Sequence, residues 1–152
     1  MTRVMVMASA ALAACSAEAP GLITQQQITG DAIEAALTLD PGDATRGRLV
    51  FEARDRGHCV LCHAVAGLEA EFQGNVGPDL STVGDRLSAG QLRLRIVDYQ
   101  IIRPGAVMPS YFRNHNLHQV GSEYEGTTIL SAQDIEDLVV YLSERKASDD
   151  DA

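Results

Sequence analysis

The chain carries Cys59-Val60-Leu61-Cys62-His63, in which two thiols lie three residues apart and an imidazole follows the second. Thiols at positions i and i+3 lie on one side of a helical turn, where each can add to one vinyl group of a haem. The histidine that follows then lies beneath the iron, to which an imidazole nitrogen is a suitable ligand. The spacing therefore predicts one covalently bound haem c, held by Cys59 and Cys62, with His63 as the proximal iron ligand.

Two other kinds of site use the same residue types. A thioredoxin-like redox pair needs C-x-x-C at the start of a helix within a βαβ unit, and no strong strand pattern lies near Cys59. A tetrahedral zinc site would have to combine Cys59 and Cys62 with His115 and His118, which lie far along the chain and in no finger-like unit. The sequence meets these two patterns only in part, whereas it meets the haem pattern fully.

The N-terminal residues have the pattern of an export signal. Arg3 is followed by an apolar run over residues 4–14, which is too short to span a bilayer as a helix. We expect residues 1–14 to be a signal peptide and the mature protein to be periplasmic. Leu12-Ala13-Ala14-Cys15 also has the pattern of a lipoprotein box with Cys15 as the lipidated residue, whereas ordinary cleavage near Ala17 would remove Cys15. Both routes are open.

Composition limits the partners and the chemistry. The chain has 152 residues, a net charge of −9, three Phe and no Trp. Such an acidic chain will not bind nucleic acid through phosphate contacts, and a basic protein surface suits it better. The core is small and poor in aromatic residues, so that a buried haem would supply the large aromatic body. With Cys59 and Cys62 on the haem and Cys15 removed or lipidated, no thiol is left for covalent catalysis.

The pattern along the chain predicts an all-α fold with little or no sheet. Residues 15–40 read as an extended leader with one short helix over residues 31–37, and residues 41–146 as the folded domain. The acidic residues 147–152 read as a disordered tail.

Three main helices are expected in the folded domain. Asp43 can cap the first, which should run to about Arg56 before Gly57. A capping box at Ser88-Ala89-Gly90-Gln91 opens the second, which should run to about Tyr99. The third begins after Ser131, with Asp134 as its reciprocating residue and an apolar stripe at Ile135, Leu138, Val139 and Leu142.

Met108 is the candidate for the second axial ligand. It is the only methionine outside the predicted signal peptide, and it lies in a loop just before Pro109. Thioether ligation favours ferrous iron and raises the reduction potential. The competing interpretations are a histidine (His58, His115 or His118), an open coordination site, or a Met that only fills a gap in the core.

Three motifs give the chain a resemblance to the class I cytochromes c. Gly47-x-x-x-Phe51 is similar to the N-terminal helix motif, residues 59–63 to the haem site, and Gly77-Pro78-Asp79-Leu80 to a loop of that family. The resemblance implies a class I cytochrome c fold in which the Pro78 carbonyl accepts the proton of His63 and Met108 closes the opposite side. Arg103, on a loop, is either a contact to a haem propionate or a surface charge.

Several flanking stretches carry a narrower resemblance. They are Leu37-Thr38, Pro41-Gly42-Asp43, Arg46-Gly47, Gly74-Asn75-Val76, Arg103-Pro104-Gly105, Met108-Pro109-Ser110-Tyr111-Phe112, Gly126-Thr127-Thr128-Ile129-Leu130-Ser131 and Tyr141-Leu142. Together they resemble the SoxX family, the monohaem subunits of the SoxAX cytochromes of bacterial sulfur oxidation.

The SoxX resemblance implies an electron-transfer subunit without catalytic residues of its own. Its partner would be a SoxA-like cytochrome, which joins thiosulfate to a cysteine of a sulfur-carrier protein as an L-cysteine S-thiosulfotransferase, and a downstream cytochrome c would accept the electrons. Two alternatives stay open, a soluble periplasmic carrier that delivers electrons to a terminal oxidase and an open-site haem enzyme or sensor.

Overall fold

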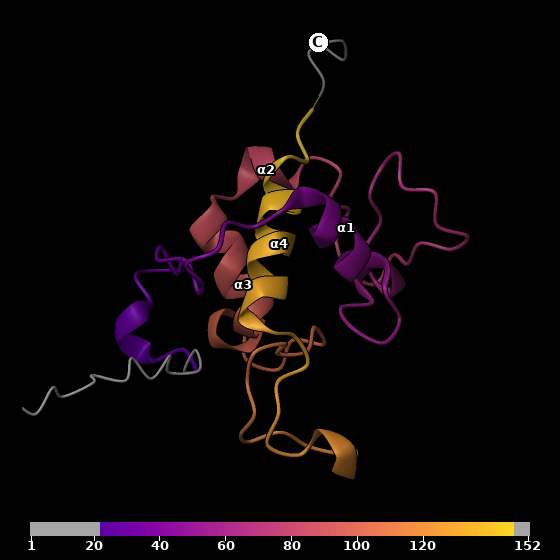
Figure 1. Cartoon of the computed structure of the whole chain (residues 1–152). Coiled ribbons are helices and arrows are strands. Elements are labelled where there is room, and N and C mark those ends of the chain that lie inside the picture. Colours follow the sequence, from indigo (N-terminus) through magenta and orange to yellow (C-terminus); the bar gives the residue numbers. More distant parts are fainter. Residues whose placement is uncertain (1–21, 148–152) are drawn as a thin grey trace, which may run out of the picture.

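The computed structural model describes residues 22–147, and its secondary structure is helical (Figure 1). Within that range the backbone forms no β-strand beyond a single bridge between Thr29 and Ala32. The all-α prediction is therefore confirmed. The predicted signal peptide, Cys15, Ala17 and the acidic residues from 148 onward lie outside the described range.

The secondary structure of the described residues consists of four α-helices and three short 3₁₀ segments. The α-helices are α1 (Ala44–Glu52), α2 (Val83–Arg86), α3 (Ala89–Ile102) and α4 (Ala132–Ser143). The 3₁₀ segments are η1 (Gln25–Gln27), η2 (Cys59–Leu61) and η3 (Ser122–Tyr124). Figure 1 shows α4 in the middle, with α1 on one side of it and α3 on the other, and α1, α2 and α3 all contact α4. Among the helices of residues 22–147, none combines the length and apolarity needed to cross a bilayer.

The two predicted capping boxes are present. The Ser88 side chain accepts a hydrogen bond from the Gln91 backbone N–H and the Gln91 side chain bonds back to Ser88. Ser131 and Asp134 form the same reciprocal pair at the start of α4. Each box satisfies N–H groups that have no partner within the first helical turn, which explains why both helices begin where the sequence predicted.

The predicted ends of the first two helices were wrong. Helix α1 ends at Glu52, not near Arg56, because Ala53 turns to an extended conformation and its carbonyl accepts hydrogen bonds from Arg56 and His58. Helix α3 continues past Tyr99 to Ile102, with a non-helical residue, Asp98, inside it. The four-residue helix α2 was not predicted.

The prediction of a helix over residues 31–37 was also wrong. The Ile33 backbone N–H donates to the Gly90 carbonyl of α3, and the Ile33 carbonyl accepts from Arg93 at 2.6 Å. In a helix the Ile33 carbonyl would instead accept from the Leu37 backbone N–H, which here donates to Glu136. Ile33 is also fully buried, so that contacts with α3 have replaced the local structure that the sequence alone favoured.

A buried ion pair ties this N-terminal segment to α3 and α4. Arg93 donates to both carboxylate oxygens of Glu136, with Nε–Oε1 at 2.7 Å and Nη2–Oε2 at 2.9 Å. The Leu37 backbone N–H donates to the same carboxylate at 2.9 Å. A buried charge is tolerated when it is paired and hydrogen-bonded, and both partners meet that condition here.

Helix α1 packs directly on α4 at Gly47. A Cβ atom at Gly47 would lie 2.1 Å from the Asp137 carbonyl oxygen, so only glycine lets the two backbones come this close. One turn later the Phe51 ring lies 5.6 Å from the Tyr141 ring. The Gly47-x-x-x-Phe51 pattern is therefore a helix contact motif.

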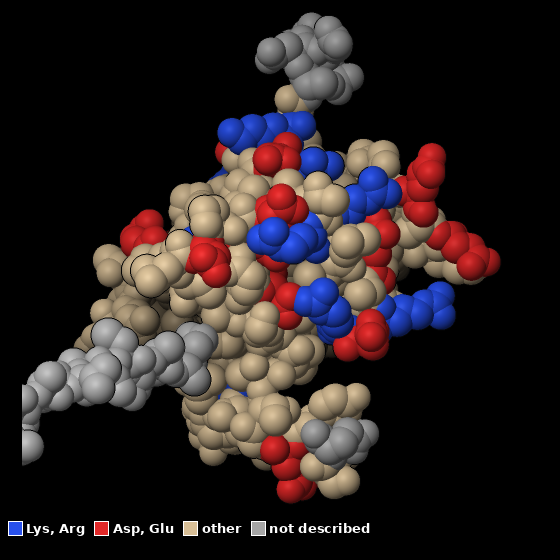
Figure 2. Space-filling model, in the orientation of Figure 1, with Lys and Arg blue, Asp and Glu red and all other residues tan. Residues whose placement is uncertain are grey.

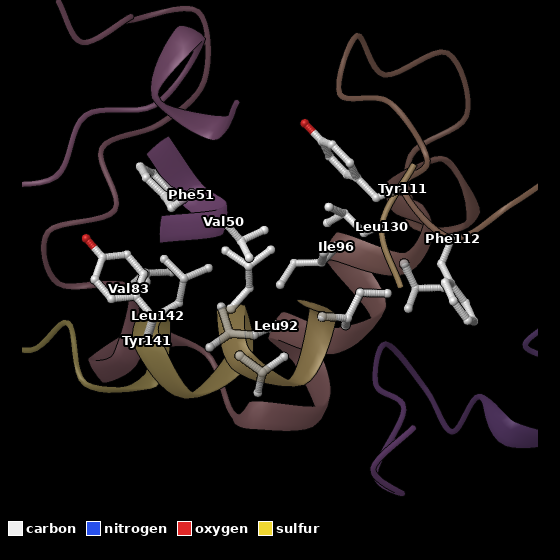
Figure 3. Packing of buried hydrophobic residues seen from close by; sticks show 14 of the residues in the cluster. Val50, Phe51, Val83, Leu92, Ile96, Tyr111, Phe112, Leu130, Tyr141 and Leu142 are labelled. Carbon is white, nitrogen blue, oxygen red and sulfur yellow. The ribbon is translucent and has the colours of Figure 1, made fainter. Parts of the chain in front are cut away.

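The core lies between these helices and the segment that follows α3. Figure 3 shows Val50 and Phe51 of α1 on one side of the cluster and Tyr111 and Leu130 on the other, with Ile96 of α3 between them. Its fully buried large side chains include Phe51, Ile33, Leu94, Leu130, Ile135 and Leu138.

Acidic and basic side chains alternate over α1 and α4 (Figure 2). Arg46 makes a two-pronged pair with the buried Asp137, both N–O distances being 2.7 Å, and Arg56 pairs with Asp134. Burial raises the pKa of Asp137, but hydrogen bonds from Arg46, Gln133 and the Asp43 backbone outweigh it, so that the pKa lies below its usual value. Asp137 thus stabilises the fold in its ionised form.

We predict that Asp137→Asn weakens the pH dependence of stability in the acid range. A carboxyl with a lowered folded-state pKa stabilises above its unfolded pKa of about 3.9, and this contribution disappears as the pH falls through the folded pKa. Urea unfolding of the holoprotein at a series of pH values measures the free energy of unfolding. As the pH falls, this free energy should decrease less steeply in the variant than in wild type. Asp55→Asn, on the exposed loop after α1, is the control and should behave like wild type. If the free energy of unfolding fell equally steeply with pH in Asp137→Asn and wild type, ionised Asp137 would not be the stabilising group.

Candidate haem site

The C-x-x-C-H stretch folds as a tight turn. His58 adopts a left-handed conformation with φ of 44°, and Cys59–Leu61 form the 3₁₀ segment η2. The backbone N–H groups of Cys62 and His63 both donate to the Cys59 carbonyl, at 3.1 and 2.9 Å. Cys59 and Cys62 are free thiols. The predicted helical turn is therefore present as a 3₁₀ turn.

The His63 ring is held by the loop that follows. Its Nδ1 lies 2.7 Å from the Pro78 carbonyl oxygen. Since a carbonyl oxygen can only accept, Nδ1 carries the hydrogen and Nε2 keeps a free lone pair. This is the contact that the family resemblance implied, and it leaves Nε2 as the atom available to a metal.

Two glycines let this loop lie against the motif. A Cβ atom at Gly77 would lie 2.3 Å from Cε1 of His63, and one at Gly74 would lie 1.9 Å from the Leu61 carbonyl oxygen. The backbone N–H groups of both glycines donate to the motif, from Gly74 to the Val60 carbonyl at 2.9 Å and from Gly77 to the Cys62 carbonyl at 2.8 Å. The loop therefore fits closely over the imidazole.

The environment of Cys59 opposes the redox-pair interpretation. Burial raises the pKa of the Cys59 thiol to about 12. Reactive cysteines of C-x-x-C redox proteins instead have lowered pKa values, because the thiolate is the nucleophile. The zinc interpretation also lacks support, since residues 22–147 contain no group of three His, Cys, Asp or Glu side chains placed to hold a metal ion. His115 and His118 are exposed in that range.

Met108 lies on the loop after α3, and the next residues tie this loop to the haem motif. Met108 is partly buried and packs against the same core cluster as Cys59. Three residues later, the buried Tyr111 hydroxyl donates to the Gly57 carbonyl at 3.0 Å. Burial raises the pKa of the Tyr111 hydroxyl, which therefore stays a hydrogen-bond donor. The Met108 loop is thus fastened beside the turn that carries the cysteines.

The family model for cytochrome c matches residues 44–146. The chain belongs to the cytochrome c family. This family binds haem c covalently, which agrees with the free thiols, the free Nε2 of His63 and the thioether of Met108. The residues present therefore fit the cofactor.

A solved structure supports the narrower resemblance. The chain aligns with one chain of the crystal structure of SoxXA from P. pantotrophus with a TM-score of 0.73 and 30% sequence identity, over 86% of this chain and 98% of that chain. The protein is therefore a SoxX-like cytochrome. The search of the curated proteins found no match.

Several residues around the site of this cytochrome were given no role at the site by the sequence analysis. They are Tyr111, which fastens the Met108 loop, and Asp98, which accepts from both Ser110 and Arg113 beside that loop. Asp98 lies four residues after the buried Leu94, on the same face of the helix. A carboxylate at such a core-facing position was the one sequence signal that could have pointed to it.

Arg103 and His58 were the remaining candidate site residues. Arg103 is exposed and directly follows α3 as its C-cap, its backbone N–H donating to the Tyr99 carbonyl. Its contact with a haem propionate stays a prediction. His58 directly precedes Cys59 and is half-buried in the left-handed conformation that opens η2.

We predict that Gly77→Ala lowers the haem content of the exported protein. The new methyl group would overlap the imidazole of His63, and disturbed outer partners of a metal ligand cost about 10-fold or more in metal binding. The ratio of haem absorbance to protein in purified samples measures the effect. Val76→Ala, an exposed neighbour, is the matched control. A Gly77→Ala protein with full haem content and an unchanged spectrum would show that the loop does not position His63.

Proposed function

We propose that this chain is the electron-transfer subunit of a periplasmic SoxAX-type complex that oxidatively couples thiosulfate to a cysteine of a carrier protein. Cys59 and Cys62 would hold one haem c through thioether bonds, and His63 and Met108 would ligate its iron. The likeness to one chain of SoxXA carries the proposed role, and the hydrogen bond from His63 Nδ1 to Pro78 supports the haem site, because it leaves Nε2 available to a metal.

The residues of the chain hold and tune the cofactor. When bound, haem c supplies a one-electron redox couple. The Pro78 carbonyl fixes the tautomer and orientation of the imidazole and increases its basicity. Met108 contributes a thioether, which favours the reduced state. Tyr111 keeps the loop of Met108 next to the cysteine turn.

The proposed role is a relay and not a catalyst. Joining thiosulfate sulfur to a cysteine sulfur forms an S–S bond and releases two electrons, which a single iron can accept only one at a time. Both thiols of residues 22–147 are assigned to haem attachment, so this part of the chain offers no free thiol for the coupling itself. The coupling chemistry belongs to the SoxA-like partner, and a downstream cytochrome c takes the electrons onward.

Exposed apolar side chains near the haem motif support a permanent partner. Leu61, Phe72 and Val76 are 62%, 79% and 71% exposed, and Leu61 and Phe72 line one surface hollow. Burying such side chains between subunits is typical of stable complexes. Glu69 and Glu71 are exposed on the same loop as Phe72, so a partner with basic groups at its rim suits this face.

One observation favours the soluble carrier as the second candidate. The net charge of −9 suits transient binding to basic protein surfaces. A carrier would remain monomeric and would pass electrons to several acceptors, whereas a subunit purifies with its partner. Lipidation of Cys15 is compatible with both functions.

We predict that Met108→Ala opens the distal site. The ferric holoprotein should lose the weak long-wavelength band of methionine-ligated haem, and the ferrous protein should bind CO readily. Absorbance spectra and CO titration measure both effects. Val107→Ala, at an 84% exposed neighbouring position, should leave them unchanged. Survival of the band in Met108→Ala would show that another residue ligates the iron. Tight CO binding to the wild-type protein would favour the open-site enzyme or sensor.

We predict that the exported chain purifies as a one-to-one complex when it is produced together with a SoxA-like cytochrome. Leu61→Glu should weaken the complex, because it places a charge in the apolar contact, while Leu39→Glu on the exposed N-terminal segment should not. Size-exclusion chromatography of the haem-stained complexes measures the effect. A chain that stays monomeric and reduces unrelated acceptors would favour the carrier.

A further inference from the structure

A buried carboxylate lies at the point where α3 meets the Met108 loop. Asp98 is 4% exposed, and its backbone leaves the helical conformation within α3. One carboxylate oxygen accepts the Ser110 hydroxyl at 2.5 Å and the Gln100 backbone N–H at 3.1 Å. The other oxygen accepts from Nη1 of Arg113 at 2.9 Å. Asp98 therefore binds the segment that directly follows Met108.

The same group of residues also holds the segment that precedes Met108. Nη2 of Arg113 donates to Oε1 of Gln100 at 3.0 Å, and Nε2 of Gln100 donates to the Ala106 carbonyl at 3.3 Å. We call Asp98, Gln100, Ser110 and Arg113 the Asp98 cluster. It fixes the chain two residues before Met108 and two residues after it.

This arrangement leaves Met108 little freedom. Only three residues, including Pro109, lie between the two fixed points, and the ring of Pro109 restricts its φ angle further. The Phe112 backbone N–H donates to the Val97 carbonyl at 3.1 Å, which anchors the same segment to α3. Without the cluster the loop would gain conformations in which the thioether lies elsewhere.

We propose that Asp98 is a positioning residue for Met108, which holds the thioether sulfur at the distal side of the haem and opposes its displacement by other ligands. The inference rests on the proposed ligation of the iron by Met108. The ionised carboxylate is suited to this role, because it accepts from Ser110 and Arg113 at once and hydrogen bonds to a charged group are stronger than neutral ones.

Imidazole binding to the ferric holoprotein tests this role. Imidazole can bind the iron only when Met108 has left it, so its apparent affinity scales with the fraction of molecules in which the loop is open. We expect Asp98→Asn and Ser110→Ala to bind imidazole about tenfold more tightly than wild type, which corresponds to about 1.4 kcal/mol. Met108→Ala gives the upper limit of the effect.

The ion pair between Arg93 and Glu136 provides the matched control. Arg93 also belongs to α3, and its pair with Glu136 is as buried as Asp98, but it contacts the N-terminal segment and not the Met108 loop. Glu136→Gln should lower stability without changing the affinity for imidazole. Urea unfolding of each holoprotein is measured as well, so that only variants with a similar loss of stability are compared.

Each outcome decides between distinct claims. If Met108→Ala tightens imidazole binding while Asp98→Asn and Ser110→Ala match wild type, the ligation stands and the positioning role is overturned. Equal tightening in Glu136→Gln overturns it too, since loss of stability would then be sufficient. If Met108→Ala leaves the affinity unchanged, the proposed ligation fails and the positioning role fails with it. Should Asp98→Asn give no holoprotein, Ser110→Ala decides by the same criterion.

Discussion

The hydrogen bond between Nδ1 of His63 and the Pro78 carbonyl is the interaction on which the site depends. It selects one tautomer, so that Nε2 is free to bind a metal, and it fixes the direction in which the ring faces. The contact exists because Gly77 has no side chain and lets the loop lie directly against the imidazole. A glycine thus sets the geometry of a neighbouring histidine, which explains how a short loop, without secondary structure, can hold a ligand firmly.

The two sides of the site are built differently. On the His63 side, a tight turn and a nearby loop supply the contacts. On the Met108 side, the Asp98 cluster joins the loop to α3 over a sequence separation like that of His63 and Pro78, and Tyr111 adds a long-range contact to Gly57. Long-range contacts depend on the fold as a whole, whereas local ones depend mainly on a short stretch of sequence. The position of the Met108 loop therefore depends on the overall fold through Tyr111.

This difference also separates what the sequence predicts from what it does not. The spacing of Cys59, Cys62 and His63 and the two capping boxes are local patterns, and the structure contains the turn and the helix starts that they predict. The helix expected over residues 31–37 is absent because Ile33 bonds to α3, a contact that no local pattern reveals. For the same reason the kink at Asp98 and its partners were not foreseen.

The proposed function requires that Cys59 and Cys62 carry a covalently attached haem. Extraction of the purified, exported protein with acidified acetone after denaturation tests it most directly, because thioether bonds survive this treatment and iron ligation does not. We expect all the haem to stay with the polypeptide, and the double variant Cys59→Ala, Cys62→Ala to lose this retention. Release of the haem into the acetone from the wild-type protein would show that no thioether bonds hold it.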